Sequence, residues 1–336
     1  MTTTKTIPEY PRLRHCTFVI RHDKESIFMV FGKDYYEVSK SEGDYKIFMS
    51  LKRYMDGRHS IKQISENTGV REEDVREIVG SLDDLGLFRQ EEQIDKIKAD
   101  VFLKAVKDIA VMWSRQIGYH RLYAELERNQ LPKEVFIGLL IETYHYVASA
   151  PKHIATAIAH CNDKKLEDIL VDYFIDEHNH AGLLAETLEN LGVPRKVLET
   201  ANPGIGTTSM INMLCDIGRN SSLAYIASTA LFEARQDDFE PAKKSFEKIS
   251  TQFGFKAEDL QPFLEHMRGD IEAGHESLLE EALKDKEYIT AKEAHEIVNF
   301  VHDVKHAFDQ FHDQVIAYYN DDASYIPRLY VDYFSL

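Results

Sequence analysis

The sequence predicts a mostly helical protein in which a small α+β domain precedes a long helical region. Strand-like runs lie only within residues 1–92, helical periodicity fills the rest, and 43% of the 336 residues are apolar. We therefore divide the chain into domains at 1–92 and 93–336.

Composition excludes several classes of protein. The three cysteines (Cys16, Cys161 and Cys215) are too scattered for a disulfide framework or a cysteine-ligated zinc, which fits a reducing compartment. The N-terminus lacks a signal-peptide pattern, and no run of roughly 18 apolar residues exists to span a membrane. We expect a cytoplasmic protein with no membrane partner.

The net charge of −17 lies mainly in the second region. Residues 1–92 hold 15 Lys and Arg against 17 Asp and Glu, and the remainder holds 25 against 40. Neither region has the basic footprint of a nucleic-acid-binding protein, so no nucleic-acid partner is expected.

The first region changes from strand-like to helix-like runs. Strands are expected at 16–20, 26–31 and 35–38, the first two forming a hairpin around the polar turn 21–25. Helices are expected at 41–54, from residue 60, and at 72–85. Three strands followed by three small helices are typical of a winged-helix domain.

These residues resemble the PqqD-like domain, the peptide-recognition module of ribosomal-peptide maturation systems. The match covers residues 8–92 and is carried by segments 10–13, 36–39, 55–57, 60–64 and 85–88. The resemblance implies that the leader of a precursor or carrier peptide adds a strand to an exposed sheet edge. DNA-binding winged helices share most of the pattern, and a purely structural domain is a further alternative.

No strand is expected after Gln93. Helices are expected at 97–128, 133–160, 164–191, 208–238, 257–284 and 291–320, with a short one near 194–200. Pro151 should kink the second of them. The tyrosine-rich tail from Tyr318 is expected to pack back onto the bundle.

Helix 164–191 carries the most informative pair of side chains. Glu177 interrupts its apolar stripe where a large hydrophobe is expected, and burial of an unpaired carboxylate is costly. His180 lies about 60° away on an ideal helix, hence on the same face. This Glu-x-x-His spacing is used by di-iron carboxylate bundles, and the alternative is a neutral hydrogen-bonded core pair. Asp176 and His178 are expected at the surface.

Two later helices add further carboxylates and imidazoles. Glu233 lies toward the apolar flank of helix 208–238, beside small residues that either leave room for a cofactor or allow close helix packing. His266 and Asp270 are one turn apart in helix 257–284.

The position of His275 on that helix is less favourable. It lies about 140° from Asp270 on an ideal helix, and a π-bulge near Gly269 and Gly274 would bring the two together. Glu272 with His275 is a competing pair, so the sequence leaves open which of Asp270, Glu272 and His275 bind metal.

A second Glu-x-x-His pair lies on helix 133–160. We predict catalytic roles for Glu142, His145 and the adjacent Tyr144, as groups that contact the substrate or support the ligands; in a ferritin-like bundle the pair would itself bind metal. On the last helix, His302 and His306 are one turn apart and are expected mainly at the surface.

Residues 95–320 resemble the seven-helix heme-oxygenase-like fold of thiaminase-like proteins and pyrroloquinoline-quinone synthase, and more closely its di-iron oxidase and oxygenase branch. The resemblance assigns metal ligation to Glu177, His180, Glu233, His266, Asp270 and His275. It implies two Fe(II) ions with O₂ as cosubstrate, although the same ligand types suit manganese. His275 comes later in its helix than the family pattern would place it.

The two resemblances together predict an iron-dependent oxidase or oxygenase that modifies a peptide held by the N-terminal domain. The alternatives are a cofactor-independent oxidase like pyrroloquinoline-quinone synthase, a thiaminase-like enzyme, a non-enzymatic peptide-binding partner, and a winged-helix regulator. The substrate and the oligomeric state stay open, a homodimer being one option.

Overall fold

Two compact units, Met1–Ile94 and Asp95–Leu336, make up the chain. The computed structural model describes residues 7–20, 26–31, 34–38, 45–88, 95–332 and 334. The described chain is mostly helical, as expected, and none of its helices combines the length and apolarity needed to cross a membrane.

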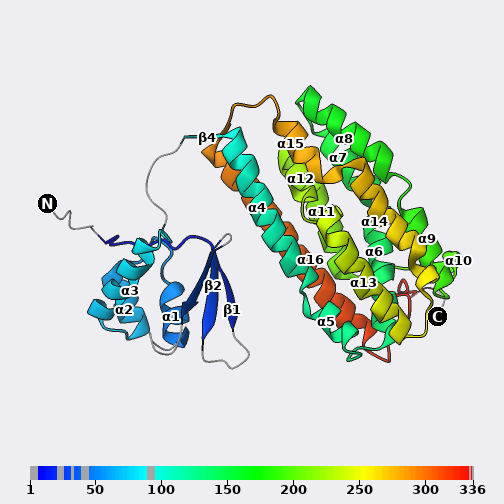
Figure 1. Cartoon of the computed structure of the whole chain (residues 1–336), viewed down its shortest axis with the longest axis horizontal. Coiled ribbons are helices and arrows are strands. Elements are labelled where there is room, and N and C mark those ends of the chain that lie inside the picture. Colours follow the sequence, from blue (N-terminus) through cyan, green and yellow to red (C-terminus); the bar gives the residue numbers. More distant parts are fainter. Residues whose placement is uncertain are drawn as a thin grey trace. The chain divides into compact units, whose positions relative to one another are not determined.

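The first unit is a three-stranded antiparallel sheet followed by three helices (Figure 1). Its strands β1 (Thr17–Ile20), β2 (Ile27–Phe31) and β3 (Asp34–Val38) lie side by side in that order. Its helices are α1 (Tyr45–Lys52), α2 (Ile61–Thr68) and α3 (Glu72–Asp84). The expected strands, hairpin pairing and helices are confirmed, whereas the turn 21–25, Ser39 and residues 41–44 of the first helix lie outside the described residues.

Alternation of side chains in β2 builds the small core. Ile27 and Met29 point inward and are buried, with Phe28 between them on the other face. They pack in one cluster with Phe48 and Leu51 of α1. The unit therefore has a hydrophobic core made entirely of its own residues.

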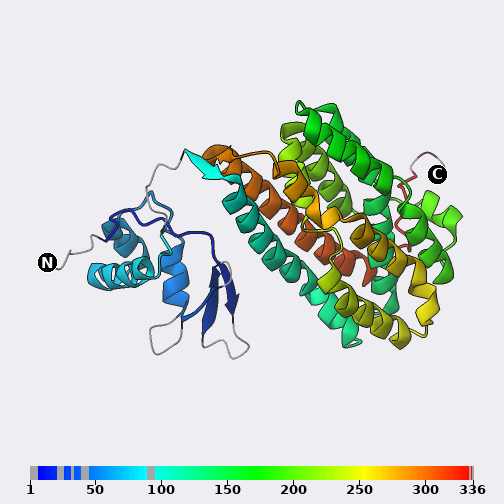
Figure 2. The ribbon, with the colours of Figure 1, turned by 45° about the horizontal axis from the view of Figure 1, so that its top comes forward.

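The second unit is a helical bundle built around one long helix (Figure 2). Its helices are α4 (Ala99–Gly118), α5 (Arg121–Glu127), α6 (Lys133–Ala148), α7 (Ala150–Ala159), α8 (Lys164–Glu177), α9 (Ala181–Asn190), α10 (Arg195–Glu199), α11 (Ile205–Asn220), α12 (Ser222–Thr229), α13 (Gln236–Gln252), α14 (Gln261–Ala273), α15 (Leu278–Leu283) and α16 (Ala291–Tyr319), with 3₁₀ turns η2 (Ala257–Leu260) and η3 (His275–Ser277). The 29-residue α16 contacts α4, α6, α11 and α12. Its buried residues recur at helical spacing, which makes it the central element of the core.

Most of the expected long helices are divided into two. The division between α6 and α7 falls beside Pro151, where a kink was expected, because Pro is tolerated best in the first turn of a helix. The expected helix 208–238 breaks at Ser221, whose hydroxyl caps α12. The short helix near 194–200 is confirmed as α10.

Three elements of the second unit were absent from the sequence prediction. Helix α13 is polar and contains Pro241, a combination that conceals its narrow buried face. Strands β4 (Lys96–Lys98) and β5 (Tyr288–Thr290) pair antiparallel, so the expectation of no strand after Gln93 is wrong. Each strand has three residues, too few for a period-two pattern to be recognised.

The C-terminal tail packs back onto the second unit, as expected. The backbone N–H of Asn202 donates to the carbonyl of Arg328 at 2.7 Å, and the Arg328 guanidinium donates to the carbonyl of Pro203 at 2.8 Å. These bonds hold the tail against the segment between α10 and α11.

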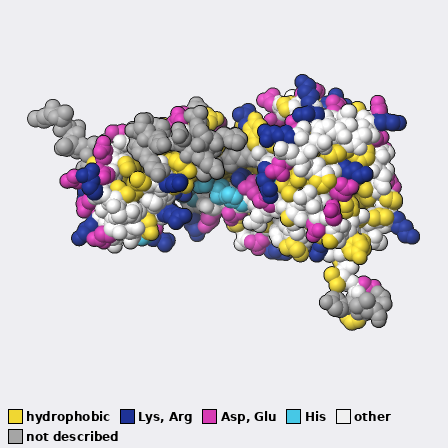
Figure 3. All heavy atoms as spheres, turned by 90° about the horizontal axis from the view of Figure 1, so that it is seen from below, with side chains coloured by type: hydrophobic (Ala, Val, Ile, Leu, Met, Phe, Trp, Pro, Cys, Tyr) yellow, Lys and Arg dark blue, Asp and Glu magenta, His cyan; other side chains and the backbone are white. Residues whose placement is uncertain are grey.

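On the face drawn in Figure 3, acidic and basic side chains are interspersed.

Candidate metal centre

The six side chains expected to bind metal come together inside the second unit. Glu177 is the last residue of α8, His180 immediately precedes α9, and Glu233 follows α12. His266 and Asp270 lie on α14, and His275 begins η3. Three separate segments of the chain thus supply three carboxylates and three imidazoles to one place.

Glu177 and His180 meet at a tightened turn rather than on one continuous helix. The N–H of His180 donates to the carbonyl of Glu177 at 3.3 Å, and the N–H of Gly182 donates to that of Asn179 at 3.1 Å, both spanning three residues. Nδ1 of His180 lies 3.1 Å from Oε1 of Glu177. The expected proximity of the pair is correct, but the expected unbroken helix 164–191 is wrong.

A left-handed glycine brings His275 to the centre. Helix α14 ends at Gly274, which has φ +73° and ψ 29°, a conformation that favours glycine. Nδ1 of His275 consequently lies 3.0 Å from Oε2 of Glu233 and 3.3 Å from Oε1 of Glu177. The expected local deviation is confirmed, although it is a helix end and not a π-bulge. The competing Glu272 is exposed, so it is not part of the centre.

Glu233 reaches the centre from a turn and not from a helix. Helix α12 ends at Thr229, and the next helix, α13, begins only at Gln236. Oε1 of Glu233 accepts a short hydrogen bond from the hydroxyl of Tyr173, and its Oε2 faces His275. The Glu233 side chain is therefore fixed on both oxygens.

Two groups of potential ligand atoms overlap at Glu177. One consists of Glu177, His180 and His266, and the other of Glu177, Glu233, Asp270 and His275, with the atoms of each group within 4.8 Å of one another. A carboxylate has two oxygens, so Glu177 could serve both groups. The arrangement fits two neighbouring cations joined by one carboxylate.

Crowding of the carboxylates changes the protonation of the imidazoles. The pKa of His180 is raised to about 10 by Asp270 and Glu177, whose oxygens lie 3.3 and 3.1 Å from its Nδ1. Burial would lower the pKa of His275, but Glu233 and the other carboxylates outweigh it and raise the value to about 9. The pKa of Glu233 is raised to about 7, chiefly by burial. Without a cation, protons on these side chains partly balance the carboxylate charge.

Polar atoms without hydrogen-bond partners test whether a cation fits. Among the described residues, five of the six side chains each carry such a buried atom: Glu177 Oε1, His180 Nδ1, His266 Nε2, Asp270 Oδ1 and His275 Nε2. Nδ1 of His180 lies 3.1 Å from Glu177 Oε1 and 3.3 Å from Asp270 Oδ1, but all three atoms are without a hydrogen bond. Buried polar atoms are normally bonded, so this concentration of unsatisfied nitrogen and oxygen fits metal ions.

Glu142 has a different environment from the one expected. Its carboxylate accepts hydrogen bonds from the N–H of Gly204 at 2.9 Å, the hydroxyl of Tyr319 at 2.9 Å and the hydroxyl of Thr207. All of its partners belong to the backbone and side chains that join α6, α11 and α16. These bonds favour a structural role for Glu142 over the predicted catalytic one.

Tyr144 and His145 are not among the two groups of potential ligand atoms. Their rings pack against each other with centroids 5.4 Å apart, and the carboxylate whose charge acts on His145 is Glu142. No hydrogen bond or ion pair in the described part of the chain joins either one to the centre. The geometry therefore gives no support to catalytic roles for Tyr144 and His145.

Two buried tyrosines, Tyr173 and Tyr225, and the half-buried Tyr146 lie beside the centre. Tyr173 lies one turn before Glu177. Burial raises the pKa of Tyr146 and of Tyr225 well above the usual range, and the nearby charge of Glu233 raises both pKa values further. The hydroxyl of Tyr225 also lies 2.6 Å from Nδ1 of His153. The one sequence signal was the spacing of four between Tyr173 and Glu177, which we assigned to the apolar stripe.

Small residues near Glu233 serve helix packing. A Cβ added at Gly218 of α11 would lie 3.0 Å from Ala157 of α7, so the glycine permits close contact of these helices. Of the two alternatives, close packing is the one observed at this position.

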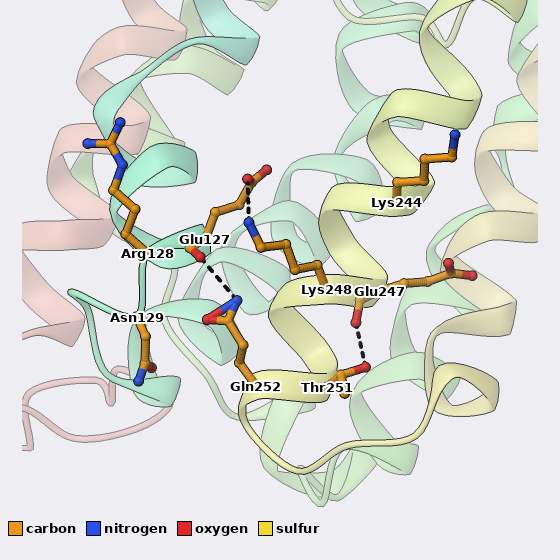
Figure 4. Close-up of a pocket in the computed structure, with 8 residues that line it drawn as sticks. All are labelled: Glu127, Arg128, Asn129, Lys244, Glu247, Lys248, Thr251 and Gln252. Carbon is orange, nitrogen blue, oxygen red and sulfur yellow. Dashed lines mark hydrogen bonds and ion pairs between the residues drawn. The ribbon is translucent and has the colours of Figure 1, made fainter.

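An open hollow lies elsewhere, between the end of α5 and α13 (Figure 4). Lys248 and Gln252 of α13 reach across it to the carboxylate and backbone of Glu127. Its lining consists of Glu127, Arg128, Asn129, Lys244, Glu247, Lys248, Thr251 and Gln252. None of these residues belongs to the metal centre.

Comparisons with known proteins agree with this fold. Residues 107–237 match the model of the TENA/THI-4/PQQC family. A domain of unknown function with a heme oxygenase-like fold from Shewanella denitrificans is 17% identical with a TM-score of 0.54, over 63% of this chain and 90% of that one. A TenA homolog from Pseudomonas syringae pv. tomato is 15% identical with a TM-score of 0.50, over 64% and 93%. A comparison with curated proteins gives no match.

These likenesses show the fold. The second unit has the expected heme-oxygenase-like architecture, and the family match lies inside it.

Proposed function

We propose that the second unit is a non-heme oxidase or oxygenase that uses O₂ and two iron ions. The observation that carries the proposal is the sharing of Glu177 between two groups of ligand atoms. One group alone would suit a single metal ion, whereas two groups with a common carboxylate suit a pair.

The residues present divide the work of holding the two ions. His180 and His266 with Glu177 would hold one, and Glu233, Asp270 and His275 with Glu177 would hold the other. When bound, two ferrous ions supply reducing electrons and open coordination positions, with which O₂ can remove hydrogen from, or add oxygen to, a substrate.

The protein's own side chains set the environment of that chemistry. Glu177, Asp270 and His275 are buried, with exposed fractions of 6%, 4% and 2%, which keeps bulk water from the centre. Asp176 is half exposed, and its Oδ2 lies 3.5 Å from Nε2 of His275. It marks the side on which the centre approaches solvent.

We further propose that the substrate is a peptide, or derives from one, and that the first unit binds its leader segment. The sheet order leaves β1 and β3 at the two edges, and Val19 and Tyr35 on these strands are 49% and 73% exposed. An extended peptide could add a strand to such an edge, with its side chains contacting the exposed residues. Under this proposal, the binding partner of the first unit is a precursor or carrier peptide.

A second candidate keeps the fold without the metal. Residues 107–237 match the model of the TENA/THI-4/PQQC family, and a cofactor-independent oxidase of the pyrroloquinoline-quinone-synthase type is the rival. It gives no reason for the three carboxylates that surround buried histidines here, which is why we place it second.

Metal analysis separates the two candidates. Protein produced with iron, or titrated anaerobically with Fe(II), should hold about two ions per chain. Glu177→Gln should lose both ions, and His180→Ala should lose one. Glu186→Gln and His178→Ala are matched controls, because both residues are exposed and lie close to Glu177 in sequence. Active protein without metal would refute the iron proposal.

Oxygen consumption tests whether the protein is an enzyme at all. With Fe(II) and a cognate peptide, O₂ uptake should accompany a change in the peptide's mass. Peptide binding with neither change would support the non-enzymatic partner instead.

A further inference from the structure

Two histidines on α16 converge on a point outside the proposed iron centre. Nε2 of His302 and Nε2 of His306 lie 3.2 Å apart, and their rings are perpendicular with centroids 4.5 Å apart. They are one helical turn apart, so the helix itself holds them on the same face. The sequence placed both mainly at the surface without assigning them a role.

Both rings are held in place by neighbours. Nδ1 of His306 lies 3.3 Å from Oδ2 of Asp309, which is itself bonded to Lys305 at 2.6 Å. The ring of His302 packs against that of Trp113 on α4, with centroids 5.0 Å apart. A metal-binding histidine commonly donates its other N–H to a carboxylate, and Asp309 occupies that position for His306.

The distance between the nitrogens matches that of two ligands on one ion. With metal–nitrogen bonds of about 2.0–2.1 Å, two ligand nitrogens lie about 2.9 Å apart at a right angle and about 3.4 Å apart at a tetrahedral angle. The observed 3.2 Å falls between these values. When no metal is bound, one hydrogen bond between the two Nε2 atoms can occupy the same position, with one neutral imidazole donating and the other accepting.

We propose that His302 and His306 form a second, surface metal site for a divalent ion that prefers imidazole, such as Zn²⁺, Ni²⁺ or Cu²⁺. Both nitrogens coordinate the ion, the proton between them passes to solvent, and water fills the remaining positions. The His306 side chain is 52% exposed, so the ion can enter and leave directly from solution. The site does not depend on the proposed iron centre.

The chain supplies its own reporter for this site. Trp113 is the single tryptophan of the sequence, and it is buried against His302. Cu²⁺ and Ni²⁺ quench indole fluorescence at short range, so an ion at the histidine pair should quench the tryptophan emission.

The test is a titration of the full chain with Cu²⁺ alone while tryptophan fluorescence is recorded. Wild type should show saturable quenching, and His306→Ala should lose it. Asp309→Asn should need about 10- to 100-fold more Cu²⁺, as expected when the carboxylate partner of a ligand histidine is removed. His178→Ala, which removes an exposed histidine from another helix, should behave as wild type.

A Glu177→Gln variant separates this proposal from the proposed iron centre. Quenching retained in Glu177→Gln and lost in His306→Ala supports a separate site. Quenching absent in wild type, or retained in His306→Ala, overturns the proposal and leaves the two histidines as a hydrogen-bonded pair. A parallel calorimetric titration with Zn²⁺ should show one fewer bound ion in His306→Ala than in wild type.

Discussion

The hydroxyl of Tyr173 donates a hydrogen bond to Glu233, and the Tyr173 ring lies edge-on to His275 at a centroid distance of 4.9 Å. One buried tyrosine therefore fixes two side chains of the same candidate ligand group. In the other group, the rings of His180 and His266 pack against each other with their centroids 5.0 Å apart. The two groups are thus supported differently.

Removal of the Tyr173 hydroxyl should weaken one metal position and spare the other. In Tyr173→Phe, Glu233 loses its donor, and we expect about 10- to 100-fold weaker binding of one ion, the usual effect of losing a partner of a ligand. Anaerobic Fe(II) calorimetry should resolve one weakened and one unchanged event. Tyr144→Phe is the control, since no hydrogen bond among the described residues joins Tyr144 to the centre. Equal weakening of both events would contradict the assignment.

The left-handed glycine at the end of α14 should be intolerant of a side chain. Gly274→Ala forces φ +73° on alanine, which we expect to cost about 1 kcal/mol of stability and to displace His275. Gly269→Ala in the same helix is the matched control. A Cβ at position 269 would have no atom within 4 Å, so this substitution should stabilise the fold by about 0.5–1 kcal/mol. Urea unfolding and iron content measure the two effects, and a Gly274→Ala protein with full iron content would be evidence against the role of the turn.

Substitution of Glu142 should lower the stability of the fold and leave metal binding unchanged. Glu142→Ala leaves the Gly204 N–H and two hydroxyls without their acceptor, and we expect a loss of about 3 kcal/mol. Iron content of the folded protein should stay at the wild-type level. A normal melting temperature with lost iron would reverse our assignment and restore Glu142 to the centre.

Buried His312 should make the protein less stable in mild acid. Burial lowers its pKa to about 3 from 6.5, so between these values the unfolded chain binds a proton that the folded chain does not. Its contribution is intact above pH 6.5 and is lost as pH falls toward 3, at about 1.4 kcal/mol per pH unit.

The measurement is urea unfolding at pH 7 and pH 5 for wild type and His312→Gln. The glutamine can still bond the Tyr123 hydroxyl, which lies 3.1 Å from His312 Nε2, but it does not titrate. The variant should therefore lose less stability on acidification than wild type. Replacement of the exposed His178 by Gln should leave the pH dependence unchanged, and an identical slope in His312→Gln would disprove the explanation.

The sequence predicted the mostly helical fold, and the family resemblance named the six side chains that the structure brings together. Glu177 was recognisable because a carboxylate interrupts an apolar stripe, and His180 because of its spacing. Periodicity assumes an ideal helix, however, and the centre is built where helices end. The approach of His275 depends on the backbone angles of Gly274, which no period reveals.

Residues that act through tertiary contacts were beyond sequence reasoning. Glu142 and His145 have the same Glu-x-x-His spacing as Glu177 and His180, yet Glu142 is occupied by hydrogen bonds from Gly204, Thr207 and Tyr319. Those partners lie far away in the chain, so local spacing could not distinguish the two pairs. Tyr173 was hidden for the opposite reason, since a buried tyrosine fits an apolar stripe.

The pairing of β4 with β5 and the central place of α16 have a consequence for synthesis on the ribosome. The first unit can complete its core as soon as its own residues emerge. The second cannot, because α4, α6, α11 and α12 all pack against α16, which is made after them, and β4 waits for β5. Its apolar faces therefore stay open until α16 has emerged, an interval in which a nascent chain is prone to aggregate and needs chaperones.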